Sequence, residues 1–220
     1  MHDHVIIVAA GAGSRMHNAL PKQFLPLAGK LVLQYSIEKF HRYNPQINIV
    51  VVVHPEYIDF WKSQYNEIPH EVLEGGTTRF ESVRNGLACI SDETGIVGIH
   101  DAARPLVSLK TIESCYHTAR AHGTAIPVIE HADSLRKLEG NASVHVDRSV
   151  YRMVQTPQCF EISLLRRAYT QPGSEAFTDD ASVVEAMGET LCLVPGNREN
   201  FKLTVPEDLR LAEALLLAYQ

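Results

Sequence analysis

The amino-acid sequence predicts an α/β protein with a doubly wound, mostly parallel sheet and a protruding β-hairpin arm. Short, continuously apolar runs alternate along the chain with segments whose apolar residues recur every three or four positions. Continuous apolar runs are typical of strands that are covered on both faces, as in parallel sheets. The alternation indicates an open sheet with right-handed crossovers. The length of 220 residues predicts one domain over residues 1–220.

Five segments are the predicted strands of this sheet. Four are apolar runs at residues 5–10, 47–53, 96–100 and 124–128, and a fifth, shorter strand is expected around Val72. The runs are separated by segments long enough for crossover helices, which parallel neighbours require. We therefore expect their carboxyl ends to meet at one edge of the sheet.

Apolar stripes at helical spacing predict three helices. The stripes are Leu33, Ile37 and Phe40; Phe80, Val83, Leu87 and Ile90; and Leu209, Ala212, Leu216 and Tyr219. The last helix also carries a start signal, because Thr204 and Glu207 have the spacing of a capping box. Pro206 would occupy the first turn of that helix.

The segment at residues 130–150 interrupts the alternation of strands and helices. Residues 134–138 and 144–148 flank Gly140 and Asn141, which predicts a β-hairpin with a loop of several residues. An isolated two-stranded hairpin is marginally stable in water and needs a partner surface. The segment is therefore expected to be either a lid over the protein's own site or an arm that pairs with a second subunit.

The composition argues against several kinds of partner. Asp and Glu outnumber Lys and Arg by 26 to 20, for a net charge of −6. Binders of nucleic acid or anionic membranes need a basic surface, so neither partner is expected. The four cysteines lack paired zinc spacing and are expected as reduced thiols of a cytoplasmic protein. No signal peptide is indicated at the N-terminus, whose apolar run is far shorter than the ~20 residues of a membrane span.

The strongest chemical signal follows the first predicted strand. Ligands of open α/β sheets bind beyond the carboxyl ends of the strands. Residues 9–16 read Ala-Ala-Gly-Ala-Gly-Ser-Arg-Met, and such small residues let a backbone wrap a ligand and direct amides at phosphates. Met16 replaces the third glycine of a dinucleotide fingerprint, and no Walker A lysine follows. Arg15 and Lys22, the latter on a loop stiffened by Pro21, are two cations that suit a triphosphate.

Two further strand ends carry polar residues. After residues 75–76, which are both glycine, Arg79 lies one helical turn from Ser82, so both can face the strand ends. A cation in a first turn opposes the helix dipole, which hints at a ligand. Asp101 directly follows another strand and is placed for a sugar hydroxyl or a metal. The alternative is a loop-capping Asp101 paired with Arg104.

The remaining candidates have weaker signals. His100 is expected to be an ordinary strand-end histidine rather than a metal or acid–base residue. Lys202 lies just before the last helix and is a further candidate cation. Asp179 and Asp180 open a predicted helix, and complementation of the helix dipole explains both acids without a function. The sequence offers no Ser-His-Asp or Cys-His triad, and no residue is predicted as a metal ligand.

Taken in order, these motifs resemble those of one known family. They are residues 9–16 with Pro21-Lys22-Gln23-Phe24, Gly75-Gly76 with Arg79 and Ser82, and the segments 100–105, 146–148, 155–158, 178–182 and 202–204. Over about residues 4–218 the ordered set is similar to the 2-C-methyl-D-erythritol 4-phosphate cytidylyltransferases, of the nucleotidylyltransferase superfamily. That family serves the methylerythritol phosphate route to isoprenoids.

The resemblance implies a Rossmann-like sheet and a homodimer built through the arm at residues 130–150. It implies transfer of CMP from CTP to the sugar-alcohol phosphate 2-C-methyl-D-erythritol 4-phosphate, giving 4-diphosphocytidyl-2-C-methyl-D-erythritol and pyrophosphate. It also implies Mg²⁺, bound mainly through the CTP phosphates.

The resemblance assigns three groups of site residues. The catalytic cations on the triphosphate would be Arg15, Lys22 and Lys202. The nucleotide-binding residues would be Ala9, Ala10, Gly11, Ala12, Gly13, Gly76, Arg79, Ser82, Asp101 and Ala102. The residues on the sugar phosphate would be Asp101, Arg104, Ser134, Arg148 and Thr156. Thr77 stands where an acidic residue is frequent, which puts one base or ribose contact in doubt. Ser134 replaces the usual threonine but keeps the hydroxyl.

Three rival functions remain open from the sequence. Ribitol-5-phosphate cytidylyltransferases share the chemistry and a similar Pro-Lys-Gln-Phe loop, although residues 102–103, both alanine, favour the methylerythritol enzymes. A nicotinamide-dependent oxidoreductase is disfavoured by Met16. A non-catalytic nucleotide-binding module has no use for Lys22 and Lys202 converging on a phosphate.

Overall fold

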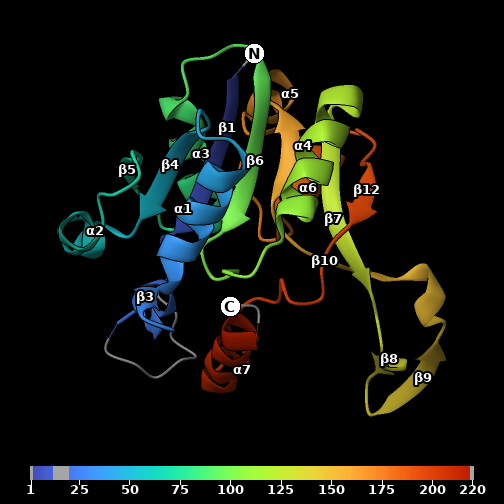
Figure 1. Ribbon diagram of the computed structural model, residues 1–220. Helices are drawn as coiled ribbons and strands as arrows, with labels where there is room; N and C mark the ends of the chain where they lie inside the picture. The colour runs from blue at the N-terminus through green and yellow to red at the C-terminus, as the bar shows by residue number, and fades with distance from the viewer. Residues whose placement is uncertain (1, 12–19, 219–220) are drawn as a thin grey trace.

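A central sheet of eight strands organises the protein (Figure 1). The computed structural model describes residues 2–11 and 20–218 of the chain. The strands of this sheet are β1 (His2–Ala9), β4 (Asn48–Val53), β5 (Glu71–Glu74), β6 (Gly95–Asp101), β7 (Thr124–Glu130), β10 (Arg152–Val154), β11 (Gln158–Glu161) and β12 (Leu193–Pro195). Their order is β10-β7-β11-β6-β1-β4-β5, with β12 also paired to β7.

The sheet is mostly parallel, as expected, and all five predicted strands are present. β1 runs parallel to β4 and β6, and β4 runs parallel to β5. The exception is β11, which lies antiparallel between β6 and β7, while β10 pairs antiparallel with β7 at the edge. The carboxyl ends of β1, β4, β5 and β6 therefore meet at one edge of the sheet.

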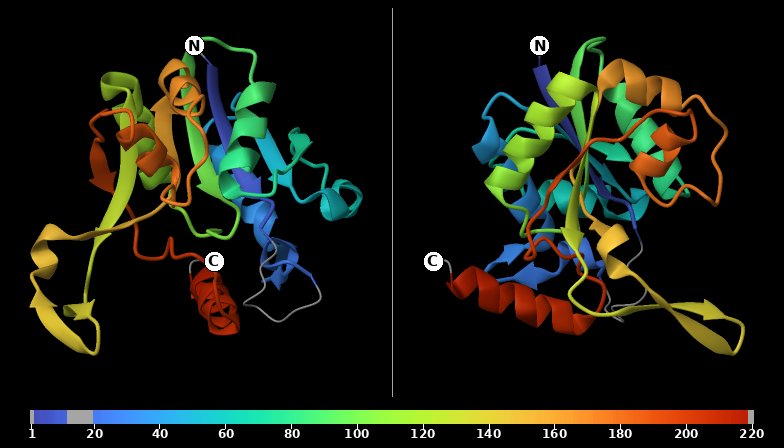
Figure 2. Two further views of the ribbon diagram at one scale, coloured as in Figure 1. Left: turned by 180° about the vertical axis from the view of Figure 1, so that it is seen from behind. Right: turned by 90° about the vertical axis from the view of Figure 1, so that its right-hand side faces the viewer.

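Helices cover both faces of the sheet. They are α1 (Val32–Tyr43), α2 (Ile58–Gln64), α3 (Arg79–Cys89), α4 (Leu109–His122), α5 (Ile162–Ala168), α6 (Asp180–Glu185) and α7 (Pro206–Ala218). Short 3-10 turns cover Lys22–Phe24 (η2), Pro55–Tyr57 (η3) and Arg148–Val150 (η4), and β2 (Pro26–Leu27) pairs with β3 (Lys30–Leu31). Helices α1, α2 and α4 pack on one face, and α3, α5 and α6 pack on the other, seen from behind in Figure 2.

The continuous apolar run of β1 reflects this double cover. Val5 and Ile7 belong to the core under α1 and α4, whereas Ile6 belongs to the core under α3, and all three are fully buried. Successive side chains of a strand point to opposite faces, so a strand covered on both sides must be apolar at every position. Fully burying such side chains stabilises the fold by about 1.5–3 kcal/mol each.

The final helix begins where the sequence predicts but by a different contact. The predicted capping box of Thr204 and Glu207 is wrong: the carboxylate of Asp208 accepts the backbone N–H groups of Thr204 and Val205, at 2.6 and 3.0 Å. With Pro206 as the first helical residue, Val205 is the residue before the helix and Asp208 is the third inside it. The acid that binds back to the start of the helix is thus Asp208, one residue later than expected, and Val205 offers no side-chain acceptor in return. Tyr219 lies outside the described residues.

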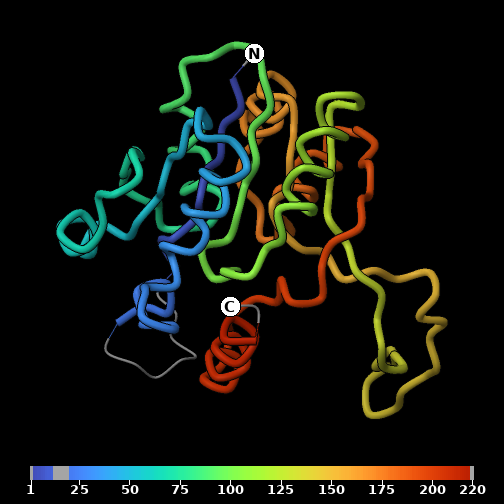
Figure 3. Tube along the Cα trace, in the orientation of Figure 1, coloured from blue at the N-terminus to red at the C-terminus, as the bar shows by residue number. Residues whose placement is uncertain are grey.

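The predicted hairpin is present and projects far from the body as an arm (Figures 2 and 3). Its strands are β8 (Leu135–Glu139) and β9 (Ala142–Val146). The expected loop of several residues is wrong, because Glu139 pairs with Ala142 and leaves only Gly140 and Asn141 between the strands. Gly140 has a φ of +62°, which suits glycine at the first position of a tight turn. Ser134 and Arg148 consequently lie just outside the paired strands.

The cysteines were expected to be free thiols. All four cysteines are free; Cys115 and Cys159 are buried, and Cys89 and Cys192 are half-buried. Across residues 2–11 and 20–218, no helix combines the length and the apolarity needed to cross a membrane.

We expect Gly86→Ala to lower the free energy of unfolding, although alanine favours helix. A methyl group at Gly86 of α3 would lie 2.8 Å from Cγ2 of the buried Ile6. Overpacking of this kind costs about 1–3 kcal/mol. The matched control is the exposed Ala88→Gly on the same helix, which measures the helix preference of about 1 kcal/mol alone. Urea unfolding that finds Gly86→Ala as stable as the wild type would contradict the close packing of α3 on β1.

Candidate active site

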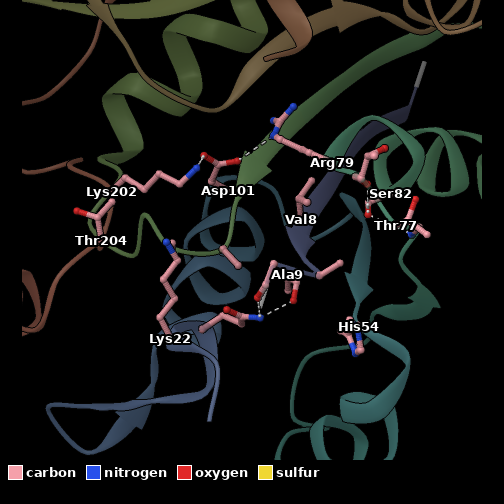
Figure 4. Close-up of a pocket in the computed structure, with 17 residues that line it drawn as sticks. Val8, Ala9, Lys22, His54, Thr77, Arg79, Ser82, Asp101, Lys202 and Thr204 are labelled. Carbon is pink, nitrogen blue, oxygen red and sulfur yellow. Dashed lines mark hydrogen bonds and ion pairs between the residues drawn. The ribbon is translucent and has the colours of Figure 1, made fainter. Parts of the chain in front are cut away.

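A cavity of about 490 Å³ opens at the carboxyl ends of β1, β4, β5 and β6 (Figure 4). Its lining residues are Val8, Ala9, Ala10, Gly11, Lys22, Gln23, His54, Gly76, Thr77, Thr78, Arg79, Ser82, Asp101, Ala102, Ala103, Lys202 and Thr204. These residues come from the segment after each parallel strand and from the segment before α7. The position agrees with the general rule for ligands of open α/β sheets.

Gln23 fastens the two halves of the first loop together. The contact that holds the turn of Lys22 to the end of β1 is made by the Gln23 side chain. Its amide nitrogen donates to the carbonyl oxygens of Ala9 at 2.6 Å and Gly11 at 3.0 Å. Gln23 is 2% exposed. Both donors of a buried amide are thus satisfied, so the 3-10 turn that carries Lys22 is fixed against the end of β1.

The second loop packs against the first because Gly75 has no side chain. A Cβ on Gly75 would lie 2.4 Å from the Cβ of Ala10. The next residue, Gly76, donates its N–H to the hydroxyl of Ser82 at 3.1 Å, and that hydroxyl donates to the carbonyl of Thr78 at 2.9 Å. Ser82 therefore holds the glycine loop to the start of α3 and keeps one lone pair for an outside donor.

Thr77 is bonded to a carboxylate from the first turn of α3. Its N–H and hydroxyl donate to the carboxylate of Glu81, at 2.8 and 2.5 Å. These bonds lower the pKa of Glu81, the hydroxyl of Thr77 being the largest cause. A carboxylate thus lies beside Thr77, supplied by the first turn of α3.

Asp101 is the electrostatic centre of the cavity. The carboxylate accepts from Lys202 at 2.8 Å and lies 3.4 Å from Nε of Arg79 and 3.8 Å from Nε of Arg104. Burial raises the pKa of this carboxyl, but Arg79, Lys202 and Arg104 together hold it below its ordinary value. Asp101 is therefore an anion whose charge is shared by three cations. The pairing with Arg104 was the alternative interpretation, and the structure contains it alongside the cavity-lining role.

Arg79 is oriented by a residue that the sequence reading did not place in the site. Its two terminal nitrogens bind both oxygens of Asp180, at 3.0 and 2.6 Å. Asp180 is fully buried and accepts a further hydrogen bond from Tyr169 at 2.6 Å. The prediction that helix-dipole complementation alone explains Asp180 is wrong, because Asp180 is the ion-pair partner of Arg79. Asp179 does cap α6, with Ser182 N–H donating to its carboxylate at 2.9 Å.

Behind Asp101 lies a chain of buried hydrogen bonds. The backbone N–H of Asp101 donates to the hydroxyl of Thr156 at 3.1 Å, and that hydroxyl lies 3.0 Å from Nδ1 of His100. Nε2 of His100 lies 3.2 Å from the carbonyl of Arg104. A neutral imidazole satisfies every member, with Nε2 donating to Arg104 and Nδ1 accepting from Thr156. Burial is the main cause that lowers the pKa of His100, to about 4.

The two lysines reach the cavity from segments that lie far apart in the sequence. The amino group of Lys22 donates to the carbonyl of Leu203 at 2.7 Å, next to Lys202 in the chain. In Figure 4 the amino groups of Lys22 and Lys202 lie on the side of Asp101, away from His54 and Thr77. We call the part of the cavity around Asp101, Lys22 and Lys202 its cationic end. The part around Gly76, Thr77 and Ser82, whose own side chains carry no charge, is its neutral end.

The structure brings most of the predicted site residues together, but not all of them. Ala9, Ala10, Gly11, Lys22, Gly76, Arg79, Ser82, Asp101, Ala102 and Lys202 line the cavity. Arg104 and Thr156 lie beside it, bound to Asn200 and to Asp101 respectively. Ser134 and Arg148 are exposed on the arm, where Arg148 donates to the carbonyl of Ala132. Ala12, Gly13 and Arg15 lie outside the described residues.

Several lining residues were not singled out by sequence reasoning. They are Val8, Gln23, His54 and Thr78; Ala103 and Thr204 were singled out only for other reasons, not as residues of the site. Gln23 belongs to the Pro-Lys-Gln-Phe motif, so its motif was found but its role was not. His54 directly follows β4, a strand end with no glycine or cation to draw attention. Reading the first residue after every predicted strand would have found it.

The side chains of the cavity fit a divalent ion that is bound mainly by the phosphates of a substrate. In the part of the chain that the structure describes, no three His, Cys, Asp or Glu side chains gather as a metal site. Asp101 is the single carboxylate that lines the cavity among those residues. Mg²⁺ commonly binds one or two carboxylates together with substrate phosphates, and this site offers such an arrangement.

Comparisons with known proteins agree on one family. The sequence model of 2-C-methyl-D-erythritol 4-phosphate cytidylyltransferase matches residues 4–218. Proteins of that name from Phocaeicola vulgatus and Bacteroides thetaiotaomicron are 48% and 49% identical to this chain, over 98% of it and 100% of each relative. The crystal structure of the protein of that name from Thermus thermophilus has a TM-score of 0.80 and 34% identity, covering 98% of both chains.

We expect acid to destabilise the fold partly through His100. The unfolded chain takes up a proton near pH 6.5, whereas folded His100 resists it down to about pH 4. Between these values the unfolded state binds more protons, so the free energy of unfolding falls as pH falls, by up to ~1.4 kcal/mol per pH unit. Urea unfolding between pH 6.5 and 5 should give a smaller slope for His100→Asn than for the wild type.

His4, whose pKa burial also lowers, keeps part of the slope in that variant. Parallel pH profiles for the wild type and His100→Asn would show that His100 is not held neutral.

Proposed function

The chain belongs to the 2-C-methyl-D-erythritol 4-phosphate cytidylyltransferase family, and from this premise we propose how its residues perform the reaction. The enzyme transfers CMP from CTP to 2-C-methyl-D-erythritol 4-phosphate, giving 4-diphosphocytidyl-2-C-methyl-D-erythritol and pyrophosphate in the methylerythritol phosphate pathway. The observation that carries our proposal is the cavity with a cationic end around Asp101 and a neutral end at the glycine loop.

The chemistry needs cations more than it needs a base. An oxygen of the sugar phosphate attacks the α-phosphorus of CTP, and the bond from that phosphorus to the bridging oxygen breaks. Pyrophosphate leaves with the electron pair. The nucleophile is already an anion, so no residue has to remove a proton. Catalysis then consists of positioning the reactants and stabilising the charge that develops on the α-phosphate and the leaving group.

Lys22 and Lys202 are the proposed source of that stabilisation, together with Arg15. Each lysine is held in place before the substrate arrives, Lys22 by the carbonyl of Leu203 and Lys202 by the carboxylate of Asp101. Preorganised cations of this kind need no rearrangement as charge develops. We propose that Mg²⁺, bound mainly through the CTP phosphates with Asp101 nearby, supplies further charge neutralisation when it is present.

The neutral end is the proposed site of the cytosine. The hydroxyl of Ser82 donates its hydrogen bond to the backbone carbonyl of Thr78, so toward a ligand it acts as an acceptor. An acceptor matches the exocyclic amino group of cytosine and opposes the carbonyl oxygen that uracil has at that position. The backbone around Ala9, Ala10 and Gly76 lines the same cavity and would supply the remaining polar contacts.

We propose that the arm joins two subunits and completes the sugar-phosphate site. Large apolar side chains lie unprotected on and near it: Leu138 is 78% exposed and Val150 is 74% exposed. Patches of this kind mark interaction surfaces. Arg148 and Ser134 are exposed on the arm, and none of the cavity lining comes from residues 130–150. A two-fold dimer would bring Arg148 of each subunit to the other's cavity, where a guanidinium grips a phosphate by two hydrogen bonds.

A cytoplasmic location without nucleic-acid or membrane partners completes the proposal. It is supported by the free thiols, which persist in reducing compartments, and by the net charge of −6.

The function is tested by pyrophosphate release from CTP with 2-C-methyl-D-erythritol 4-phosphate, and with ribitol 5-phosphate as the competing acceptor. We expect activity with the first acceptor and at most a small fraction of it with the second. UTP and ATP should be at least about tenfold poorer than CTP in kcat/KM, a difference of ~1.4 kcal/mol. Equal use of UTP would contradict the proposed reading of the base by Ser82.

Lys22→Ala should lower kcat by about 10²–10³ while leaving the unfolding midpoint nearly unchanged, because one preorganised charge is lost. The matched control is Lys30→Ala, whose lysine pairs with Glu38 at 2.7 Å on the surface. The control should keep wild-type turnover. Retention of more than about a third of wild-type turnover by Lys22→Ala would refute its catalytic role, and a loss of thermal stability would make it structural.

Mixing Arg148→Ala subunits with Lys22→Ala subunits tests the shared site. Each variant alone should be nearly inactive. If Arg148 acts on the partner's cavity, a mixed dimer has one intact site of two, and activity reappears after subunit exchange. A mixture that stays inactive, with exchange demonstrated by labelled subunits, would place the arm over its own site. A monomer by light scattering would remove the dimer altogether.

A further inference from the structure

A buried carboxylate outside the cavity controls one of the cations inside it. Asp180, the first residue of α6, is fully buried and is absent from the lining of the cavity. Both of its oxygens are bound by Arg79, and one also accepts from the hydroxyl of Tyr169. Arg79 does line the cavity, and its remaining nitrogen faces Asp101.

The support around Asp180 is rigid. Gln158 of β11 donates to the carboxylate of Asp179 and accepts the N–H of Ala181, both at 2.8 Å, which ties the start of α6 to the sheet. The ring of Tyr169 stacks on Phe80, the neighbour of Arg79 in α3, with centroids 4.6 Å apart. The strand β11 and helices α3, α5 and α6 therefore fix Asp180 relative to Arg79.

The geometry of the guanidinium makes this contact directional. A guanidinium is planar, and its five donors form a rigid fork. Because Asp180 takes the two terminal nitrogens, the plane of Arg79 is set and only Nε points at Asp101, at the long distance of 3.4 Å. If Asp180 did not hold the terminal nitrogens, they would be free to close on Asp101 as a two-pronged ion pair. Asp101 already accepts from Lys202, so that pair would take up lone pairs that are otherwise left for a ligand.

We propose that Asp180 is a positioning residue: it holds Arg79 back so that Asp101 stays open to the hydroxyl groups of the sugar phosphate. The proposal rests on the proposed function and on the role in binding the sugar phosphate that the family resemblance implies for Asp101. It assigns Asp180 an effect on substrate binding that acts through Arg79 alone. If Asp180 had a purely structural role, its replacement would lower stability and would not change the ratio of the KM values for the two substrates.

The first test is steady-state kinetics of Asp180→Asn, which keeps the shape of the side chain and removes its charge. We expect the KM for 2-C-methyl-D-erythritol 4-phosphate to rise about tenfold, as for a lost hydrogen bond to a charged group. The KM for CTP should rise at least threefold less. Equal changes in the two KM values, or a larger change for CTP, would overturn the proposal.

The second test asks whether Asp180 acts through Arg79. In an Arg79→Ala background no guanidinium can close on Asp101, so adding Asp180→Asn should leave the KM for the sugar phosphate unchanged. Independent effects would instead multiply. A further rise in the double variant would overturn the proposal.

Tyr169→Phe keeps the test decisive if Asp180→Asn does not fold. It removes one hydrogen bond to Asp180 and should shift the same KM in the same direction by a smaller factor. The matched control is Tyr116→Phe, which also removes a hydroxyl bonded at 2.6 Å, but to the backbone of His4 in the core. The control should lower the melting temperature without changing the ratio of the two KM values. Equal kinetics of the two variants would overturn the proposal.

Asp101→Asn separates this inference from the proposed function. If Asp101→Asn leaves the KM for the sugar phosphate unchanged, the proposed role of Asp101 is wrong and the inference falls with it. If Asp101→Asn raises that KM and Asp180→Asn does not, only the inference is wrong.

Discussion

The carboxylate of Asp101 holds together the parts of the cavity. It lies at the end of β6 and attracts Arg79 from α3, Arg104 from its own loop and Lys202 from the segment before α7. Without a buried anion these cations would repel one another in a protein interior, where charges interact more strongly than in water. Three cations, among them the proposed triphosphate ligand Lys202, are thus gathered around one negative charge, in a chain whose net charge is −6.

The scaffold supports this carboxylate from behind with neutral hydrogen bonds. Thr156 accepts the N–H of Asp101, and His100 and Thr156 lie within hydrogen-bond distance of one another. Gln23 performs the corresponding task for the first loop, where it binds two backbone carbonyls. Such buried, fully paired polar groups fix a geometry, because leaving any one of them unpaired is costly. The reacting groups at the surface of the cavity therefore rest on a rigid inner layer.

Most of the fold was predictable because it follows from neighbours in the sequence. The strand at β1 is apolar at successive positions, and this alone indicates a strand covered on both faces. The antiparallel strand β11 was missed, since its four residues carry no periodic signal of their own. The loop of the arm was expected to be longer, because the pattern marks Gly140 and Asn141 as a turn but does not set which residues pair across it.

The sequence by itself determined which chemical groups are available: the small residues of the first loop, the glycines of the second and Asp101 at strand ends, and Lys22 and Lys202 in two other segments. The tertiary structure alone decided which of these groups meet and in what orientation. Asp180 shows the reason. An acid in the first turn of a helix is explained equally well by the helix dipole and by an ion pair. Its partner Arg79 lies 101 residues away, and only the order of strands in the sheet brings the two together.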